Sequence, residues 1–168
     1  MYIGIDNGIS GTIGIIDENG VGYQYPMPTK NTLNYQKTKV KHINRVDVVE
    51  LKRLLAPYRG LETKCLLERP MVNPSRFEAT TSALRALEAT LIILEVLEIG
   101  YDYVDSKAWQ KALLPYISVA DKKEFPAKLK MVSKEVGMRK YPNIAWEEFK
   151  DADGVLIAEY CRMINQGV

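Results

Sequence analysis

The fold is decided by residues 2–26, YIGIDNGISGTIGIIDENGVGYQYP. Short apolar runs at 2–5 and 12–17 predict two strands, joined by a glycine-bearing turn at 7–11. Asn19-Gly20 is a strong hairpin signal and predicts a third strand at Gly22 to Pro26. The chain therefore opens with an antiparallel three-strand meander. The polar stretch 28–44 has no persuasive period, and we interpret it as a loop or extended segment.

Downstream of the meander, helices are expected to alternate with strands. Short apolar runs predict strands at 64–68 and 101–104. Helical spacing of apolar residues predicts helices at 47–56 with Asp47 as cap, at 75–98, at 106–114 with Ser106 as cap, between 125 and 136, and from about 150–153 onward. A meander followed by parallel strand–helix units predicts an α/β fold with a mixed five-stranded sheet and helices on its faces.

Length and composition narrow the class of protein. A chain of 168 residues and 19.1 kDa predicts one domain over 1–168, and its 46% hydrophobic and 26% charged residues exclude fibrous and low-complexity classes. The strongest apolar stretch, Ala89 to Gly100, is interrupted by Glu95 and Glu98, so we expect a soluble chain with no membrane partner.

Cysteine and histidine usage narrow the chemistry. Cys65 and Cys161 lie far apart and form no zinc motif, and the N-terminus lacks an export signal, so both thiols are expected to be buried and unpaired in a cytoplasmic protein. His42 is the only histidine and lies in a lysine-rich stretch, which argues against a histidine-based triad. The remaining candidates for catalytic groups are carboxylates, lysines and bound metal.

Charge is divided unevenly along the chain. Segment 30–53 carries a net charge of +5 and segment 107–140 carries +6, although the whole chain carries only +2. The remainder is therefore acidic. This layout is typical of a metal-dependent enzyme that acts on nucleic acid, because basic blocks grip a polyanion while acids hold a cation. The other interpretation is that the lysine runs are simply solvated faces.

Carboxylates fall at the ends of three predicted elements. Asp6 and Glu68 each end a short apolar strand, and Asp151 and Asp153 begin the last helix. Burying an ionised carboxylate is costly unless a cation or hydrogen bonds compensate, so convergence of these side chains predicts a site for Mg²⁺ or Mn²⁺. Two such ions activate water and stabilise the leaving oxygen in phosphodiester hydrolysis.

Each carboxylate also has a structural interpretation. Asp151 or Asp153 alone fits a helix cap, Glu68 fits an ion pair with Arg69 or another surface cation, and Asp6 before Asn7-Gly8 fits a turn former. The functional interpretation depends on the combination.

Three segments together resemble a known family. They are Ile3-Gly4-Ile5-Asp6-Asn7-Gly8, Leu67-Glu68-Arg69-Pro70, and Asp151-Ala152-Asp153-Gly154 with the helix that follows. In order and spacing they resemble the RuvC-type Holliday junction resolvases of the RNase H-like superfamily, and residues 69–77 are similar to phage-encoded members. The resemblance implies an endonuclease that binds branched DNA in the cytoplasm of a bacterial or phage-infected cell, acts as a homodimer, and uses Mg²⁺ or Mn²⁺, two ions per site.

The resemblance also implies roles for single residues. Asp6, Glu68 and Asp153 match the metal-binding acids of the family. Lys150 stands where the family has a fourth ligand, and Asp151 or Glu148 is the substitute, with Asp151 preferred. Lys107 resembles a lysine that lies near the scissile phosphate; alternatively it is a surface lysine.

Candidate DNA contacts lie outside the acids. Met71 and Phe77 flank a proline-containing loop after Glu68, where an apolar side chain can wedge between bases, unless both pack down. Phosphate or DNA contacts are expected from the basic residues Arg76, Lys37, Lys39, Lys41, Lys122, Lys123 and Lys128. The leucine row of helix 75–98 fits either a two-fold dimer interface or burial on the sheet.

Three other functions remain open from the sequence. The run Asp6 to Thr12 also suits an actin-like or sugar-kinase-type phosphotransferase, although that architecture uses two copies of the domain and this chain has one. Lys150 at the departing position suits a non-catalytic branched-DNA-binding protein. A relative that processes RNA would differ only in its substrate.

Overall fold

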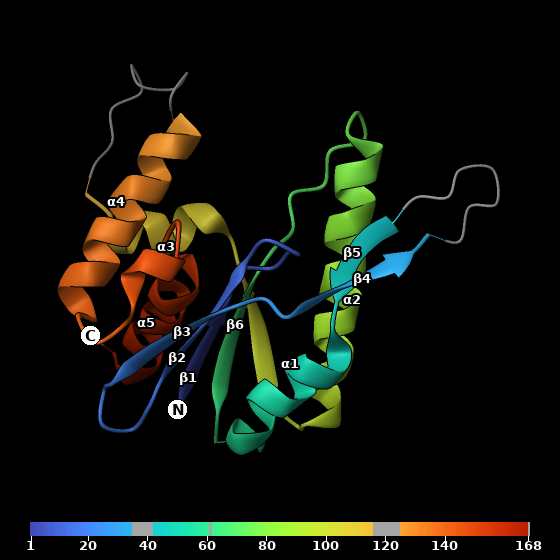
Figure 1. Cartoon of the computed structure of the whole chain (residues 1–168). Coiled ribbons are helices and arrows are strands. Elements are labelled where there is room, and N and C mark those ends of the chain that lie inside the picture. The colour runs from blue at the N-terminus through green and yellow to red at the C-terminus, as the bar shows by residue number, and fades with distance from the viewer. Residues whose placement is uncertain (35–41, 61, 116–124, 168) are drawn as a thin grey trace.

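The computed structural model describes residues 1–34, 42–60, 62–115 and 125–167, and it places helices on both faces of a central sheet (Figure 1). Its strands are β1 (Tyr2–Ile5), β2 (Thr12–Ile16), β3 (Gly22–Pro26), β4 (Thr29–Leu33), β5 (His42–Val46), β6 (Lys64–Glu68) and β7 (Gly100–Val104). Its helices are α1 (Val48–Leu55), η1 (Ala56–Tyr58), α2 (Phe77–Val96), α3 (Ser106–Leu113), α4 (Phe125–Lys140), η3 (Trp146–Glu148) and α5 (Asp153–Gln166).

The central sheet has five strands in the order β3-β2-β1-β6-β7. β1 pairs antiparallel with β2, and β2 with β3, which confirms the predicted meander. β6 joins β1 in parallel, and β7 joins β6 in parallel. The predicted mixed five-stranded α/β sheet is therefore confirmed. Because β1 and β6 run in the same direction in register, the residues that follow Ile5 and Leu67 leave the sheet at the same edge.

Two hydrophobic clusters hold the helices against the sheet. Ile3 and Ile5 of β1 point into one cluster, which also contains Leu51 of α1 and Leu94 of α2. The other contains Trp109 of α3 together with the apolar residues of α5. Figure 1 shows α1 and α2 on one side of the sheet and α3, α4 and α5 on the other.

A pair of glycines lets α5 lie directly on the sheet. Gly4 and Gly14 are cross-strand partners on β1 and β2. A Cβ at Gly4 would stand 2.1 Å from the backbone nitrogen of Ala158, and a Cβ at Gly14 would stand 2.2 Å from Cα of Val155. Both distances are far shorter than any real Cβ contact. The sheet therefore accepts the backbone of α5 only because both positions lack a side chain.

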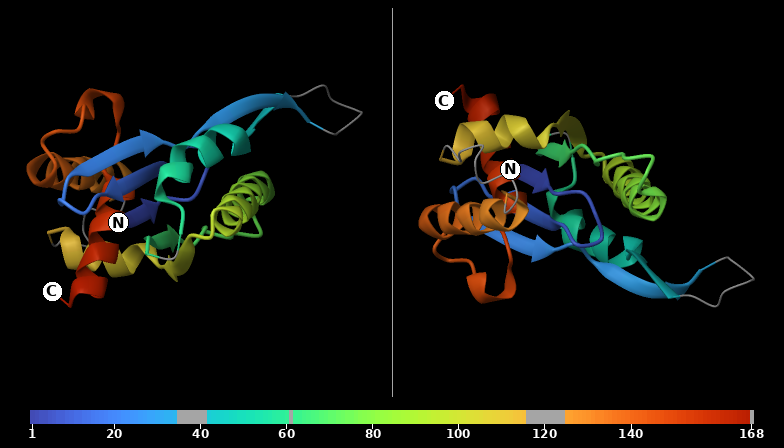
Figure 2. Two further views of the ribbon diagram at one scale, coloured as in Figure 1. Left: turned by 90° about the horizontal axis from the view of Figure 1, so that it is seen from below. Right: turned by 90° about the horizontal axis from the view of Figure 1, so that it is seen from above.

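Residues 29–33 and 42–46 form two strands that the sequence does not predict. β4 and β5 pair antiparallel and form a two-stranded sheet of their own, which leads away from the body of the molecule past α2 (Figure 2). Both strands are extended, in line with one of the two interpretations of stretch 28–44, but the sequence does not predict their pairing. Their apolar residues, Leu33, Ile43 and Val46, do not alternate regularly with polar ones, so no period of two marks the strands. An Asn31–Asn44 side-chain hydrogen bond of 3.0 Å joins them.

Helix positions follow the predictions with three differences. The Asp47 side chain caps α1 as expected, accepting hydrogen bonds from the backbone of Val49 and Glu50. Ser106 is the first residue of α3 and does not cap it. α4 continues to Lys140, past the predicted end at 136. Gly137, in this additional part of the helix, lies against Ala152 and Trp146 and keeps α4 in contact with the segment that precedes α5.

The third difference concerns the leucine row of α2. The buried residues of this helix are Ala86, Thr90, Ile93 and Leu94, whereas Leu84 is 44% exposed. Leu87 and Leu91 are partly buried against the same core as Leu94, so three of the four leucines of the predicted row, Leu84, Leu87, Leu91 and Leu94, pack on the protein and Leu84 does not.

Two predictions about the chain as a whole can be compared with the structure. Cys65 and Cys161 are both buried and free, as expected. Across the described residues, no helix is both long and apolar enough to cross a bilayer.

A buried ion cluster ties the end of α4 to α5. The Glu159 carboxylate, 4% exposed, accepts hydrogen bonds from Lys140, Tyr141 and Arg162 at 2.8–3.0 Å. Burial alone would raise its pKa, but the three donors outweigh burial and lower the pKa of Glu159 to about 2.

This cluster predicts acid sensitivity. The native pKa lies below the unfolded one, so Glu159 stabilises the fold fully above pH ~4.5 and loses that contribution as the pH falls toward 2. We expect the loss to be about 1–3 kcal/mol. Urea unfolding between pH 7 and pH 3 should show a smaller drop in the free energy of unfolding for Glu159→Gln than for wild type. Equal drops would contradict the assignment.

Candidate metal centre

Asp6 leaves the sheet at the end of β1. Its backbone N–H donates to the carbonyl of Thr12 at 3.0 Å, which closes the turn over residues 7–11. Gly11 packs so tightly on this turn that a Cβ there would stand 2.0 Å from the carbonyl oxygen of Asp6. The backbone of Asp6 is therefore fixed. Its carboxylate makes no hydrogen bond with any residue that the structure describes.

Asp151 and Asp153 are delivered by the start of α5, which the sheet itself caps. The backbone N–H of Gly154 donates to Thr12 Oγ1 at 2.9 Å, and that of Val155 donates to Gln24 Oε1 at 3.1 Å. Gln24 also donates to the carbonyl of Asp151 at 2.9 Å. Side chains of β2 and β3 thus accept hydrogen bonds from N–H groups at the start of α5, as the side chain of an N-cap residue usually does. The residue at the N-cap position is Ala152, which has no capping side chain. Asp151 Oδ1 accepts a long hydrogen bond of 3.4 Å from the backbone N–H of Asp153, and the Asp153 side chain caps nothing among the described residues.

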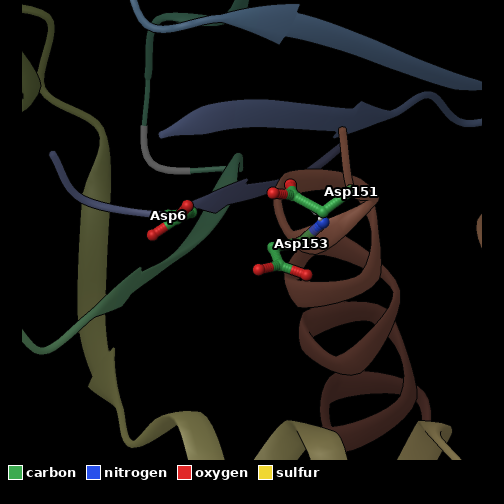
Figure 3. Close-up of side chains that lie close together, drawn as sticks. All are labelled: Asp6, Asp151 and Asp153. Carbon is green, nitrogen blue, oxygen red and sulfur yellow. Dashed lines mark hydrogen bonds between the residues drawn. The ribbon is translucent and has the colours of Figure 1, made fainter. Parts of the chain in front are cut away.

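Three carboxylates meet beside the end of β1 (Figure 3). Asp6, Asp151 and Asp153 each offer one oxygen, and these oxygens all lie within 4.8 Å of one another. Asp151 is buried, and the other two are partly buried. Residues far apart in the chain thereby form one compact acidic cluster, as the sequence analysis anticipated for the strand and helix ends.

Burial and neighbouring carboxylates raise the pKa values of two acids in the cluster. Burial, then the charges of Glu68 and Asp151, raise the pKa of Asp6 to about 7. Burial and Asp151 likewise raise the pKa of Asp153 to about 7. Each shift means that an added charge in this place is unfavourable when the neighbouring carboxylates are ionised. A bound cation would remove that penalty.

Glu68 lies beside the cluster rather than inside it. It ends β6, the parallel neighbour of β1, and its Oε2 accepts a hydrogen bond of 2.8 Å from Nε1 of the fully buried Trp109. Burial raises the pKa of Glu68 to about 7, with Asp153 and Asp151 adding to the rise and the Trp109 bond opposing it. The pKa of Glu68 therefore depends on the same charges, although its carboxylate does not supply one of the three mutually close oxygens.

Helix α4 supplies three side chains that hold residues 149–153. Lys130 Nζ lies 2.7 Å from Asp151 Oδ2, and Lys134 Nζ donates to the carbonyl of Phe149 at 2.7 Å. Ser133 is fully buried and bonds both Ala152 and Asp153. The sequence analysis did not identify this face of α4. Its only signal is the spacing of Lys130, Ser133 and Lys134 on one helix face, which many surface helices share.

The residues considered as alternative ligands or ion-pair partners are not members of the cluster. Glu148 and Lys150 are both exposed, and Glu148 is absent from the three-carboxylate cluster. Arg69 pairs with Asp105 at 3.1 Å and stacks over Tyr103, so the predicted structural role of Glu68 as a partner of Arg69 does not hold.

The candidate DNA-contact residues are exposed where they are described. Met71 is 85% exposed and Phe77 is 77% exposed, so neither packs down. Arg76 precedes α2, Lys107 lies on α3 and Lys128 on α4, all of them exposed. Lys37, Lys39, Lys41, Lys122 and Lys123 lie outside the described residues.

The cluster has the chemistry of a divalent-cation site. Its donors are carboxylate oxygens, which Mg²⁺ and Mn²⁺ prefer. The Asp6 carboxylate has no hydrogen-bond donor among the described residues, and Lys130 lies beside the cluster, bound to Asp151. The residues therefore fit a metal ion.

Comparison with known proteins agrees with this fold. No protein-family model matches the chain, and no curated protein sequence matches it. Among solved structures, Thermus thermophilus RuvC in complex with a Holliday junction substrate is similar, with 15% identity, a TM-score of 0.53, and coverage of 96% of this chain and 94% of that one. A second T. thermophilus RuvC structure matches with 15% identity and a TM-score of 0.51, over 98% and 95% of the two chains. The chain therefore has a RuvC-like fold.

Proposed function

We propose that this protein is a divalent-metal-dependent endonuclease that cleaves Holliday junctions and other branched DNA. The observation that carries the proposal is the convergence of Asp6, Asp151 and Asp153 at one edge of a RuvC-like sheet. T. thermophilus RuvC, whose fold is similar, has been solved in complex with a Holliday junction substrate. In the proposal Asp6, Glu68, Asp151 and Asp153 hold two ions of Mg²⁺ or Mn²⁺.

When bound, the ions would activate a water and stabilise the leaving oxygen of the phosphodiester. The chain's own residues position the reaction. Trp109 fixes one oxygen of Glu68, and the turn over residues 7–11 fixes the backbone of Asp6. Lys130, half-exposed and beside Asp151, offsets the negative charge that would otherwise repel a phosphate. Lys107 supplies a further point charge near the scissile phosphate.

The DNA branch is held outside the metal centre. Met71 and Phe77 present exposed apolar side chains on the segment that follows Glu68, and one of them wedges between bases at the branch point. Arg76, Lys128 and the lysines at 37, 39, 41, 122 and 123 contact phosphates. Such contacts select DNA shape more than sequence.

The proposed enzyme is a homodimer, since paired incisions need two sites. Leu84, Ile92 and Val96 are 44%, 48% and 56% exposed and lie on one face of α2, with the exposed Glu88 between Leu84 and Ile92. This row is the proposed contact between two copies.

The dimer predicts the effect of one substitution. Ile92→Glu should yield a folded monomer at concentrations where the wild type is a dimer, because it places a charge in the apolar contact without touching the core. Light scattering after size exclusion measures this. Val49→Glu, at a 58% exposed position of α1, is the control and should stay dimeric. A dimeric Ile92→Glu would place the interface elsewhere.

Cleavage of labelled synthetic substrates tests the function. Four-way junctions, forks and plain duplex are incubated with Mg²⁺, Mn²⁺ or chelator. We expect paired nicks in the branched substrates, with either ion, and none with chelator. Cleavage of RNA but not of branched DNA would identify an RNA-processing nuclease instead.

A second candidate is a branched-DNA-binding protein without cleavage. The Lys130–Asp151 ion pair favours it, because an ammonium already offsets part of the negative charge. Tight junction binding with no cleavage in either ion would select it. Saturable nucleotide binding in calorimetry would instead favour an actin-like phosphotransferase.

A further inference from the structure

Ser133 of α4 hydrogen-bonds two groups at the start of α5. Its hydroxyl is fully buried and lies 3.1 Å from the backbone nitrogen of Ala152 and 2.5 Å from Asp153 Oδ1. The N–H of Ala152 only donates, so the Ser133 oxygen accepts from it. When Asp153 is ionised its oxygens can only accept, so the O–H of the serine donates to Oδ1.

This bond acts on one oxygen of Asp153 and leaves the other free. Asp153 Oδ1 receives the Ser133 hydroxyl, while Oδ2 has no hydrogen bond within the described part of the chain. A hydroxyl donor favours the ionised carboxylate, opposing the effect of burial on Asp153. The bond thus holds the carboxylate in one orientation, with Oδ2 available to a ligand.

The three acids of the cluster are held in different ways. Asp6 has no side-chain hydrogen bond among the described residues, and Asp151 is paired with a half-exposed lysine that can move away. Asp153 alone is tethered by a buried neutral group. α4 can reach it because Gly137, one turn beyond Ser133, lies directly against Ala152.

We propose that Ser133 is a positioning residue of the metal centre, which orients the Asp153 carboxylate for a divalent cation by anchoring its Oδ1. This inference rests on the proposed function, because it assigns a cation to the cluster. Groups that orient metal ligands typically change metal affinity by 10–100-fold when removed.

Titration of the full-length protein with Mn²⁺ alone, followed by calorimetry, tests the proposal. Ser133→Ala should bind Mn²⁺ about 10–100-fold more weakly than wild type. Lys130→Gln, one turn away on the same helix, should bind Mn²⁺ as tightly as wild type or more tightly, since it removes a competing positive charge. Thr90→Val removes a buried hydroxyl of α2 that bonds only its own helix, and should leave the affinity unchanged.

Cleavage gives a second readout. If Ser133 orients a metal ligand, saturating Mn²⁺ should restore most of the cleavage rate of Ser133→Ala, whereas a purely structural serine would lower stability without changing the Mn²⁺ dependence. Should Ser133→Ala fail to fold, Ser133→Cys keeps the volume with a weak donor and should show the same loss of affinity.

The outcomes separate this inference from the proposed function. Folded Ser133→Ala and Ser133→Cys variants that bind Mn²⁺ within twofold of wild type would overturn the positioning role and leave the nuclease intact. A wild-type protein that binds no Mn²⁺ and cuts no DNA would overturn both.

Discussion

Asp6→Asn is expected to abolish metal-dependent cleavage of branched DNA, with a rate at least on the order of 10³-fold below wild type. Asp6 contributes one of the three mutually close oxygens, and its backbone is locked between β1 and the turn that follows. An amide in its place keeps the shape of the side chain but removes the charge that attracts a cation. Junction nicking under single-turnover conditions measures the effect.

The same substitution should stabilise the metal-free protein. Burial and the charges of Glu68 and Asp151 raise the pKa of Asp6 to about 7, so at pH 8 the ionised carboxylate is held against repulsion. Asp6→Asn removes this repulsion and should raise the thermal midpoint in chelator while junction binding persists. Asp102→Asn, an exposed position of β7, is the matched control and should alter neither property. Wild-type cleavage by Asp6→Asn would refute the metal-centre assignment.

Gly14→Ala is expected to cost about 3 kcal/mol of stability or more and to weaken Mn²⁺ binding as well. The new Cβ would stand 2.2 Å from both Cα and N of Val155, which are backbone atoms of α5 and cannot rotate away. The helix must shift off the sheet, and it would carry Asp153 away from Asp6. Urea unfolding and Mn²⁺ titration measure the two effects separately.

Gly100→Ala is the control for this substitution. Gly100 begins β7 in the same sheet, and a Cβ there meets nothing within 4 Å. Its stability should match or slightly exceed that of wild type, because alanine restricts the unfolded chain more than glycine does. If the two alanine variants were equally stable, the close approach of α5 to the sheet would be wrong.

The acids could be predicted from sequence because each stands where a buried element ends. An aspartate directly after Ile5 or a glutamate directly after Leu67 has no reason to be there in terms of packing alone, and the parallel pairing of β1 and β6 then brings the two strand ends together. The order of the meander followed from the Asn19-Gly20 turn in the same way. The strand ends and the turn could be predicted because each depends on residues that are adjacent in the sequence.

The face of α4 could not be predicted. A serine or a lysine inside a helix has no pattern that identifies its distant partner, and Ser133 and Lys130 acquire their roles only when α4 packs on residues 151–153. The caps of α5 are equally hidden, because Thr12 and Gln24 lie on strands more than a hundred residues earlier in the chain. The pairing of β4 with β5 could not be predicted because their few apolar residues do not alternate with polar ones along the strands.

The bond between Thr12 and Gly154 joins residues that are 142 positions apart in the sequence. During translation the opening strands emerge from the ribosome long before α5 exists, so one face of β1 and β2 stays uncovered until synthesis has passed residue 166. Asp6 meanwhile lacks Asp151 and Asp153, the two other carboxylates of the cluster. A nascent chain therefore assembles the acidic cluster only after α5 has been made and has packed on the opening strands.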